Sequence, residues 1–239
     1  MTPAGGLELL FLHALPLDGA MWAAQARLLQ GSNRAPTLYR FGNSIEAWAA
    51  GALSVTKGQR LIVVGCSVGG SCALEVATIA PDRVAAIVLI GAKAAHRPDP
   101  ALHDAALRTI AANGLGAAWS DYWGPLFSPA ASRVVIDDAR RLMLAQPSAD
   151  IARGVSVFHT RPSRTDVLST FPRPVVVITG ADDVAPGRAT STAQAALALR
   201  GRLHVIPDCG HYVPLERPEQ LNAILEAVIE ACRQELTME

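Results

Sequence analysis

Short apolar runs alternate along most of the chain with longer segments of helical periodicity. The runs have the length of strands and are rich in β-branched residues, which is typical of strands covered on both faces. They lie at 7–12, 61–65, 84–91, 175–180 and 203–207, with a weaker candidate at 37–41. Helical patterns occupy 19–29, 44–55, 68–80, 188–199 and 218–233. This alternation predicts an α/β fold with a doubly wound, mostly parallel sheet and right-handed crossovers.

The alternation stops between residues 93 and 172, where strand-like runs disappear and helical segments are punctuated by Pro and Gly. A loop of about 80 residues without structure would be unusual in a compact domain. We therefore predict that residues 93–172 form an inserted helical cap over one edge of the sheet. Residues 1–92 and 173–239 would form the α/β core.

The composition limits the kinds of binding partner that we expect. Half of the 239 residues are hydrophobic, and 21 basic residues balance 21 acidic ones, so charge gives no reason to expect nucleic acid or an anionic membrane as a partner. Apolar runs are too short to span a bilayer, and the N-terminus lacks the pattern of a secretory leader, so we expect a cytoplasmic protein. The four cysteines form neither a C-x-x-C pair nor a cluster with zinc-ligand spacing, and no metal site is expected.

The strand run at 61–65 leads through Gly65-Cys66-Ser67-Val68-Gly69 into a helical segment. A G-x-S-x-G sequence between a strand and a helix is typical of a nucleophile elbow, a sharp turn that exposes the serine hydroxyl. Ser67 is therefore the candidate nucleophile, against the alternative of an ordinary glycine-rich connection.

A serine nucleophile needs a base, and the base needs an acid that orients it. His211 follows Gly210 in a loop after the last strand run, and we assign it as the base. Asp182 and Asp183 both follow the run at 175–180, and the residues alone leave the choice of acid open. Loops at the carboxyl ends of parallel strands meet at one edge, where such sheets place their sites.

An acyl-transfer site also needs backbone N–H groups that stabilise an oxyanion. Val68, directly after the nucleophile, supplies one, and Leu15, in the loop after the first strand run, supplies the other because Pro16 has no N–H. We interpret His13 in the same loop as a structural residue rather than a catalytic one.

Four motifs in this order resemble the α/β-hydrolase superfamily over nearly the whole chain: His13-Ala14-Leu15-Pro16, Gly65 to Gly70, Gly180 to Asp183, and Gly210-His211 with Pro214, Glu216 and Pro218. The resemblance implies a serine hydrolase without a cofactor, and it selects Asp183 as the acid, with Asp182 as the fallback. Two departures stand out. Ala14 replaces the usual glycine of the oxyanion loop, and the N-terminus is shortened, so one sheet edge would be open, covered by a loop or buried in a homodimer.

The predicted cap carries an aromatic cluster formed by Trp119, Tyr122, Trp123 and Phe127. We assign these four residues to an apolar substrate pocket, against the alternative that they only pack the cap onto the sheet. Arg140, Arg141 and Arg161 are expected to be solvated, with the binding of a substrate carboxylate or an acyl-carrier partner as the second interpretation.

Together these features predict cleavage of an ester or lactone of a small to medium apolar molecule through an acyl-enzyme. Carbon–carbon bond hydrolysis and thioester cleavage would use the same three side chains. A binding module that retains the fold without catalysis is the alternative from another class.

Overall fold

The protein, described by a computed structural model over residues 6–238, is built on one parallel sheet. Its strands run in the order β2-β1-β3-β4-β5-β6. They are β1 (Leu7–Leu12), β2 (Asn33–Arg34), β3 (Arg60–Cys66), β4 (Val84–Ile90), β5 (Val175–Gly180) and β6 (Gly201–Ile206). The predicted α/β fold with a parallel sheet is confirmed.

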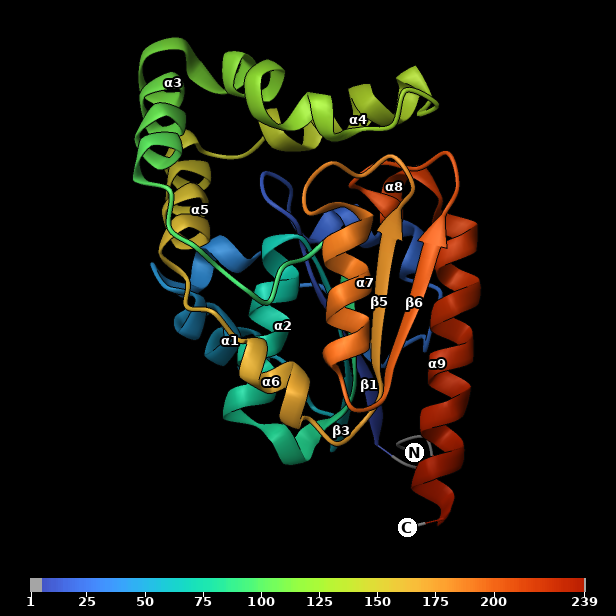
Figure 1. Cartoon of the computed structure of the whole chain (residues 1–239). Coiled ribbons are helices and arrows are strands. Elements are labelled where there is room, and N and C mark those ends of the chain that lie inside the picture. The colour runs from blue at the N-terminus through green and yellow to red at the C-terminus, as the bar shows by residue number, and fades with distance from the viewer. Residues whose placement is uncertain (1–5, 239) are drawn as a thin grey trace.

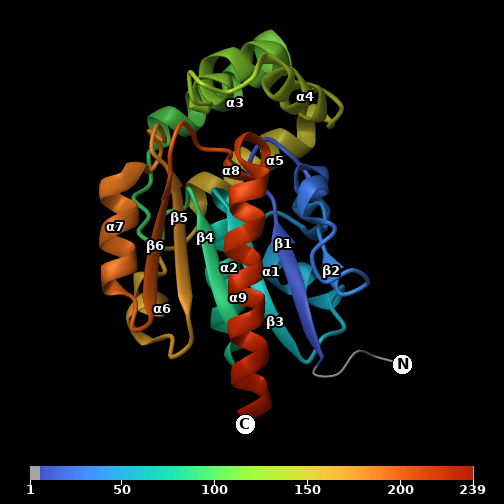
Figure 2. The same ribbon diagram turned by 90° about the vertical axis from the view of Figure 1, so that its right-hand side faces the viewer.

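Helices cover both faces of the sheet. One layer contains α1 (Ile45–Ser54), α2 (Val68–Ile79) and α7 (Gly187–Leu197), and the other contains α9 (Pro218–Met238) and the 3₁₀ helix η1 (Gly19–Gln25) (Figures 1 and 2). This double cover explains the unbroken apolar sequence of the central strands, since every residue of β4 is buried. Short 3₁₀ helices lie at Leu38–Phe41 (η2) and Pro81–Arg83 (η3).

The segment between β4 and β5 contains helices joined by loops and no strand, as its pattern predicts. It contains α3 (Pro100–Ala118), a π-helical turn η4 (Trp119–Trp123), a 3₁₀ turn η5 (Gly124–Leu126), α4 (Arg133–Leu144), α5 (Ser148–Thr160) and α6 (Thr165–Thr170). Figure 1 shows α3 and α4 beyond the carboxyl ends of the strands, with α4 next to the short helix α8 (Val213–Glu216). Helix α6 instead lies against α2 and α7. The division at 93 and 172 into cap and core stays a prediction, and we call residues 93–172 the cap segment.

Two expectations about local structure are wrong. The weak strand expected at 37–41 is the 3₁₀ helix η2, and the strand beside β1 is Asn33–Arg34. The backbone N–H of Leu38 donates to Nε2 of His13 at 2.8 Å, so it takes no part in the sheet. The helix expected at 19–29 is a 3₁₀ helix that ends at Gln25.

Within residues 6–238, no helix is long and apolar enough to cross a membrane. The same residues contain no group of three or more His, Cys, Asp or Glu side chains placed to hold a metal ion.

Candidate active site

Ser67 lies at the sharp turn between β3 and α2. Its backbone adopts φ 54° and ψ −119°, a conformation that costs energy for a residue with a side chain. The turn packs tightly against the end of β1, because a Cβ atom on Gly69 would lie 2.1 Å from the carbonyl oxygen of Leu12. The strained serine is thus held by a backbone contact that only glycine permits.

Asp183 and His211 meet in a buried pair. Nδ1 of His211 lies 3.2 and 3.3 Å from the two carboxylate oxygens of Asp183, and the side chains are 3% and 0% exposed. Oδ1 of Asp183 also accepts a hydrogen bond from the N–H of Ala185 at 2.8 Å. With Nδ1 donating to the carboxylate, Nε2 of the neutral imidazole remains available as a proton acceptor.

Asp182, the other candidate acid, is directed elsewhere. The hydroxyl of Ser128, in the cap segment, donates to Oδ2 of Asp182 at 2.6 Å. The two neighbouring carboxylates therefore have different partners: Asp183 contacts the imidazole of His211, and Asp182 joins the loop after β5 to the cap segment.

Gly91, at the end of β4, lies directly beneath the acid–imidazole pair. A Cβ atom there would be 2.9 Å from Nδ1 of His211 and 3.1 Å from Oδ2 of Asp183, and the residue has φ +53°. Sequence reasoning did not assign Gly91 to the site. The signal in the sequence was a glycine at the end of a buried strand, β4, which pairs with β3, since a glycine there often marks a close approach of other groups.

Ser67 and His211 line the same cavity. It has a volume of about 210 Å³ and lies between the carboxyl ends of the strands and the cap segment. In the described residues no hydrogen bond joins the Ser67 hydroxyl to His211. Catalytic hydrogen bonds are often long or poorly aligned in ligand-free enzymes and tighten when substrate binds. The cavity is smaller than the roughly 300–1,000 Å³ of typical ligand sites, which favours a small substrate.

Two backbone N–H groups close to this cavity lack acceptors. Within residues 6–238, the N–H groups of Leu15 and Val68 donate no hydrogen bond. Val68 is the first residue of α2, where the helix dipole favours negative charge, and Leu15 lines the cavity. Ala14, the departure from the usual glycine, is fully buried, and its N–H donates to the thioether sulfur of Met21 at 3.2 Å.

His13 is fully buried in this loop. Its Nε2 accepts from the N–H of Leu38 at 2.8 Å, so Nδ1 carries the proton and donates to the carbonyl of Ala14 at 3.1 Å. Burial lowers the pKa of His13 to about 4, against the weaker opposing effects of the Ala14 carbonyl and the Asp18 charge. The neutral ring supports the loop through its hydrogen bonds and does not line the cavity.

Glu216, at the end of α8, holds the loop that carries His211. Its buried carboxylate accepts from three backbone N–H groups, those of Ser128 at 3.0 Å, Gly210 at 2.9 Å and Tyr212 at 3.1 Å. Two of these donors flank His211, and the third belongs to the cap segment. Glu216 belongs to the motif around His211, but the sequence alone assigns it no role, because nothing in the pattern shows that its carboxylate is buried.

The four aromatic residues assigned to the pocket divide into two pairs. Tyr122 and Trp123 line the cavity. Trp119 and Phe127 do not, which departs from our expectation: their ring centroids lie 5.9 Å apart, and Phe127 packs against Tyr212 at 4.7 Å. These two side chains join the cap segment to the loop after β6.

The expectation that Arg161 is solvated is wrong. Arg140 and Arg141 are exposed on α4, whereas Arg161 is 4% exposed and lines the cavity with Ser67 and His211. Arg161 follows directly after α5, and periodicity alone does not show that the chain there turns back toward α2.

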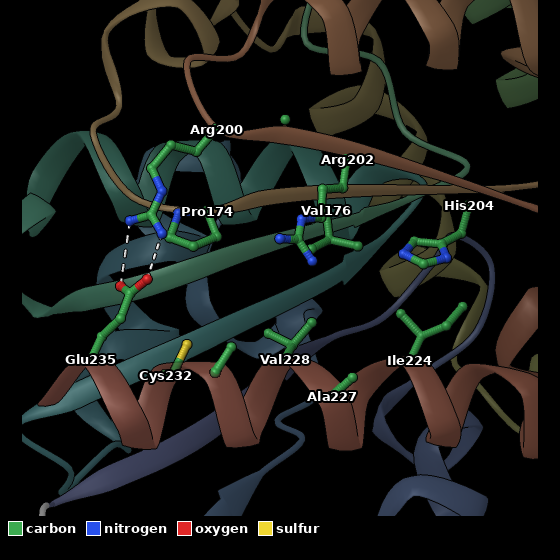
Figure 3. A pocket seen from close by; sticks show the side chains of 12 residues that line it. Pro174, Val176, Arg200, Arg202, His204, Ile224, Ala227, Val228, Cys232 and Glu235 are labelled. Carbon is green, nitrogen blue, oxygen red and sulfur yellow. Dashed lines mark hydrogen bonds and ion pairs between the residues drawn. The ribbon is translucent and has the colours of Figure 1, made fainter. Parts of the chain in front are cut away.

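A second cavity, of about 340 Å³, lies between β6 and α9 (Figure 3). An ion pair between Arg200 and Glu235 closes one end. Cys232 and His204 lie at opposite ends of this cavity. Burial raises the pKa of Cys232 to about 11, so its thiol is protonated at neutral pH. Although this cavity is larger, the grouping of a strained serine with a buried acid–imidazole pair identifies the first cavity as the candidate active site.

Comparison with known proteins agrees with this architecture. Residues 9–224 match the sequence profile of the alpha/beta hydrolase family. A thermophilic esterase from Thermogutta terrifontis, solved with malate bound, is 26% identical, with a TM-score of 0.81 over 95% of this chain and 90% of that one. The enol-lactonase of Burkholderia xenovorans LB400 is 17% identical (TM-score 0.79, covering 94% and 91%), and MenH from S. aureus is 15% identical (0.82, covering 97% and 96%). The last two likenesses concern the fold alone.

Replacing Gly91 with alanine is expected to disturb the acid–imidazole pair. The new methyl group would press on Nδ1 of His211 and on Asp183, so we expect kcat/KM toward a 4-nitrophenyl ester to fall by roughly ten- to a thousandfold. The matched control is Gly31→Ala, which imposes alanine at a similar positive φ (+79°) with no atom within 4 Å of the new methyl. Equal activity of the two variants would contradict the assigned contact.

Glutamine at position 216 would have no charge and only one acceptor oxygen in place of two. The three backbone N–H groups that now donate to the Glu216 carboxylate would therefore be less well satisfied. We expect the free energy of unfolding, measured in urea, to fall by about 2 kcal/mol, with a lower kcat because the His211 loop loosens. Glu219→Gln is the control, since that side chain is 84% exposed and pairs only with Arg27 at the surface. A Glu216→Gln protein as stable and as active as this control would show that the carboxylate does not hold the loop.

His13 is expected to make folding stability depend on pH. The folded protein keeps the ring neutral down to pH about 4, whereas an unfolded chain binds a proton near pH 6.5. Its contribution is therefore fully present above pH 6.5 and is lost as the pH falls toward 4, by up to about 3 kcal/mol. Urea unfolding from pH 7 to 4 should give a shallower pH dependence for His13→Gln than for the unmodified protein. Parallel curves would show that folding does not lower the pKa of His13.

Proposed function

The chain belongs to the alpha/beta hydrolase family, and on that basis we propose that it is a serine hydrolase of carboxylic esters or lactones. The observation that carries the proposal is the grouping of Ser67, at a strained strand-to-helix turn, with the buried Asp183–His211 pair around one small cavity. The similarity to the Thermogutta terrifontis esterase, at 26% identity, supports the same class.

In the first half of the proposed reaction, Oγ of Ser67 attacks the substrate carbonyl carbon while Nε2 of His211 takes the hydroxyl proton. The carbonyl electrons move to oxygen, and the N–H groups of Leu15 and Val68 stabilise the oxyanion. When the tetrahedral intermediate collapses, the bond to the alcohol breaks, and the imidazolium returns its proton to the leaving oxygen. Asp183 orients the ring and stabilises its positive charge.

In the second half, water attacks the acyl-enzyme and gives its proton to the same imidazole. Collapse of the second intermediate releases the acid and returns the proton to Ser67. Hydrolysis of a lactone follows the same steps, with both products on one molecule. The chemistry needs no group beyond these side chains and water.

The lining of the cavity supports a compact substrate with an apolar part. Leu102, Ala106 and Leu126 from the cap segment, with Val155 and Phe158 of α5, give it apolar walls, and Tyr122 and Trp123 add aromatic ones. Apolar walls of this kind gain free energy by removing hydrocarbon from water, and they exclude water that would weaken the oxyanion contacts.

Ser67→Ala is expected to lower kcat toward 4-nitrophenyl acetate by at least about a thousandfold while leaving the urea unfolding curve close to that of the unmodified protein. A fluorophosphonate should label the unmodified protein at Ser67 and fail to label this variant. Ser54→Ala, an exposed serine at the end of α1, is the control and should retain labelling and turnover. Undiminished turnover by a folded Ser67→Ala protein would exclude the assigned nucleophile.

A further inference from the structure

Arg161 is a buried cation without an anionic partner in the described residues. Its Nε donates to the hydroxyl of Ser71 at 2.9 Å, and Nη1 donates to the carbonyl of Phe158, the residue whose ring lies 4.0 Å below the guanidinium carbon. Neutral oxygens and a ring face thus satisfy part of the guanidinium. Nη2 has no hydrogen-bond partner within residues 6–238.

A neighbouring arginine shows the contrast. Arg164 also contacts α2, but there it meets Glu75, with two hydrogen bonds of 2.8 and 3.2 Å. Ser71 and Glu75 lie one turn apart on the same helix, so α2 gives a carboxylate to Arg164 and only a hydroxyl to Arg161. A buried guanidinium without a counter-ion is costly, and such an arrangement is common where a ligand supplies the missing charge.

The surroundings of Arg161 are positive as well. Lys93 adds a second positive charge to the lining of the same cavity, which also contains His159, and among the described residues the lining contains neither Asp nor Glu. Burial, with smaller effects from His103, Arg161 and His96, lowers the pKa of His159 to about 4, so this imidazole is neutral at pH 7. Burial also lowers the pKa of Arg161, to about 10, which leaves it charged at neutral pH. One part of the cavity is therefore positive, while much of the remaining wall is apolar.

We propose that the cavity accepts small esters or lactones that carry a carboxylate group, and that Arg161 binds this group while the scissile carbonyl lies at Ser67. The inference rests on the proposed function, since it names the substrate class of the same site. Guanidinium and carboxylate are both planar and can form two parallel hydrogen bonds, which suits a fixed anchor better than a flexible ammonium would. With a cavity volume of about 210 Å³, the carboxylate and the reacting carbonyl must belong to one compact molecule.

The test compares two substrates that differ only in charge, mono-4-nitrophenyl glutarate and its methyl ester. The unmodified protein should hydrolyse the anionic ester with at least about tenfold higher kcat/KM. In Arg161→Gln we expect kcat/KM for the anionic ester to fall by roughly 10- to 100-fold, while the value for the methyl ester changes by less than about threefold. Arg161→Lys should keep part of the preference, because the charge remains.

The control is Arg153→Gln, on α5 but outside the cavity lining, where the arginine pairs with Asp150. It should retain the full preference for the anionic ester. If the unmodified protein shows no preference, or if Arg161→Gln loses activity toward both esters equally, Arg161 only joins the cap segment to α2 and the inference is overturned.

A protein that hydrolyses neither ester would contradict the proposed function, and the carboxylate site is then tested by calorimetric titration with glutarate. Binding to the unmodified protein that weakens at least about tenfold in Arg161→Gln would support the site. Absence of binding to the unmodified protein, or equal binding to both, would overturn it.

Discussion

The geometry of the candidate active site depends on one buried contact, the pairing of the Asp183 carboxylate with the His211 imidazole. Both side chains are almost completely removed from water, so each needs the other as a partner. Their contact joins the loops after β5 and β6 directly above Gly91 at the end of β4. Because Nδ1 of His211 contacts the carboxylate of Asp183, Nε2 is the ring nitrogen left to accept a proton. His211 and Ser67 line the same cavity.

The cap segment is tied to this pair by polar as well as apolar contacts. Glu216 accepts hydrogen bonds from both sides of His211 and from Ser128, and the hydroxyl of Ser128 in turn binds Asp182. The cap segment and the loop that carries His211 are therefore parts of one hydrogen-bond network. The hydrogen bonds of Glu216 and Ser128 therefore fix the position of the His211 loop relative to the cap segment.

Much of this arrangement could be predicted from the sequence, because it follows from local patterns. The positions of the long buried strands could be predicted, because an unbroken apolar run between polar turns has few other interpretations. Strands β1 and β5 have the predicted bounds. Two-residue β2 was missed because it is too short to show a pattern, and 37–41 has strand-like composition but is held as a 3₁₀ helix by His13. The burial of Arg161 and the packing of Trp119 against Phe127 depend on contacts between distant segments, which periodicity does not contain.

The most direct test of the central claim is a crystal structure of the protein after reaction with a small alkyl fluorophosphonate. The account predicts a covalent bond from phosphorus to Oγ of Ser67, with a phosphonyl oxygen about 2.7–3.1 Å from the N–H nitrogens of Leu15 and Val68. It also predicts Nε2 of His211 within hydrogen-bond distance of Oγ or of an adduct oxygen, with Nδ1 still paired to Asp183. Reaction at another residue, or an adduct on Ser67 with the imidazole of His211 turned away from it, would contradict the account.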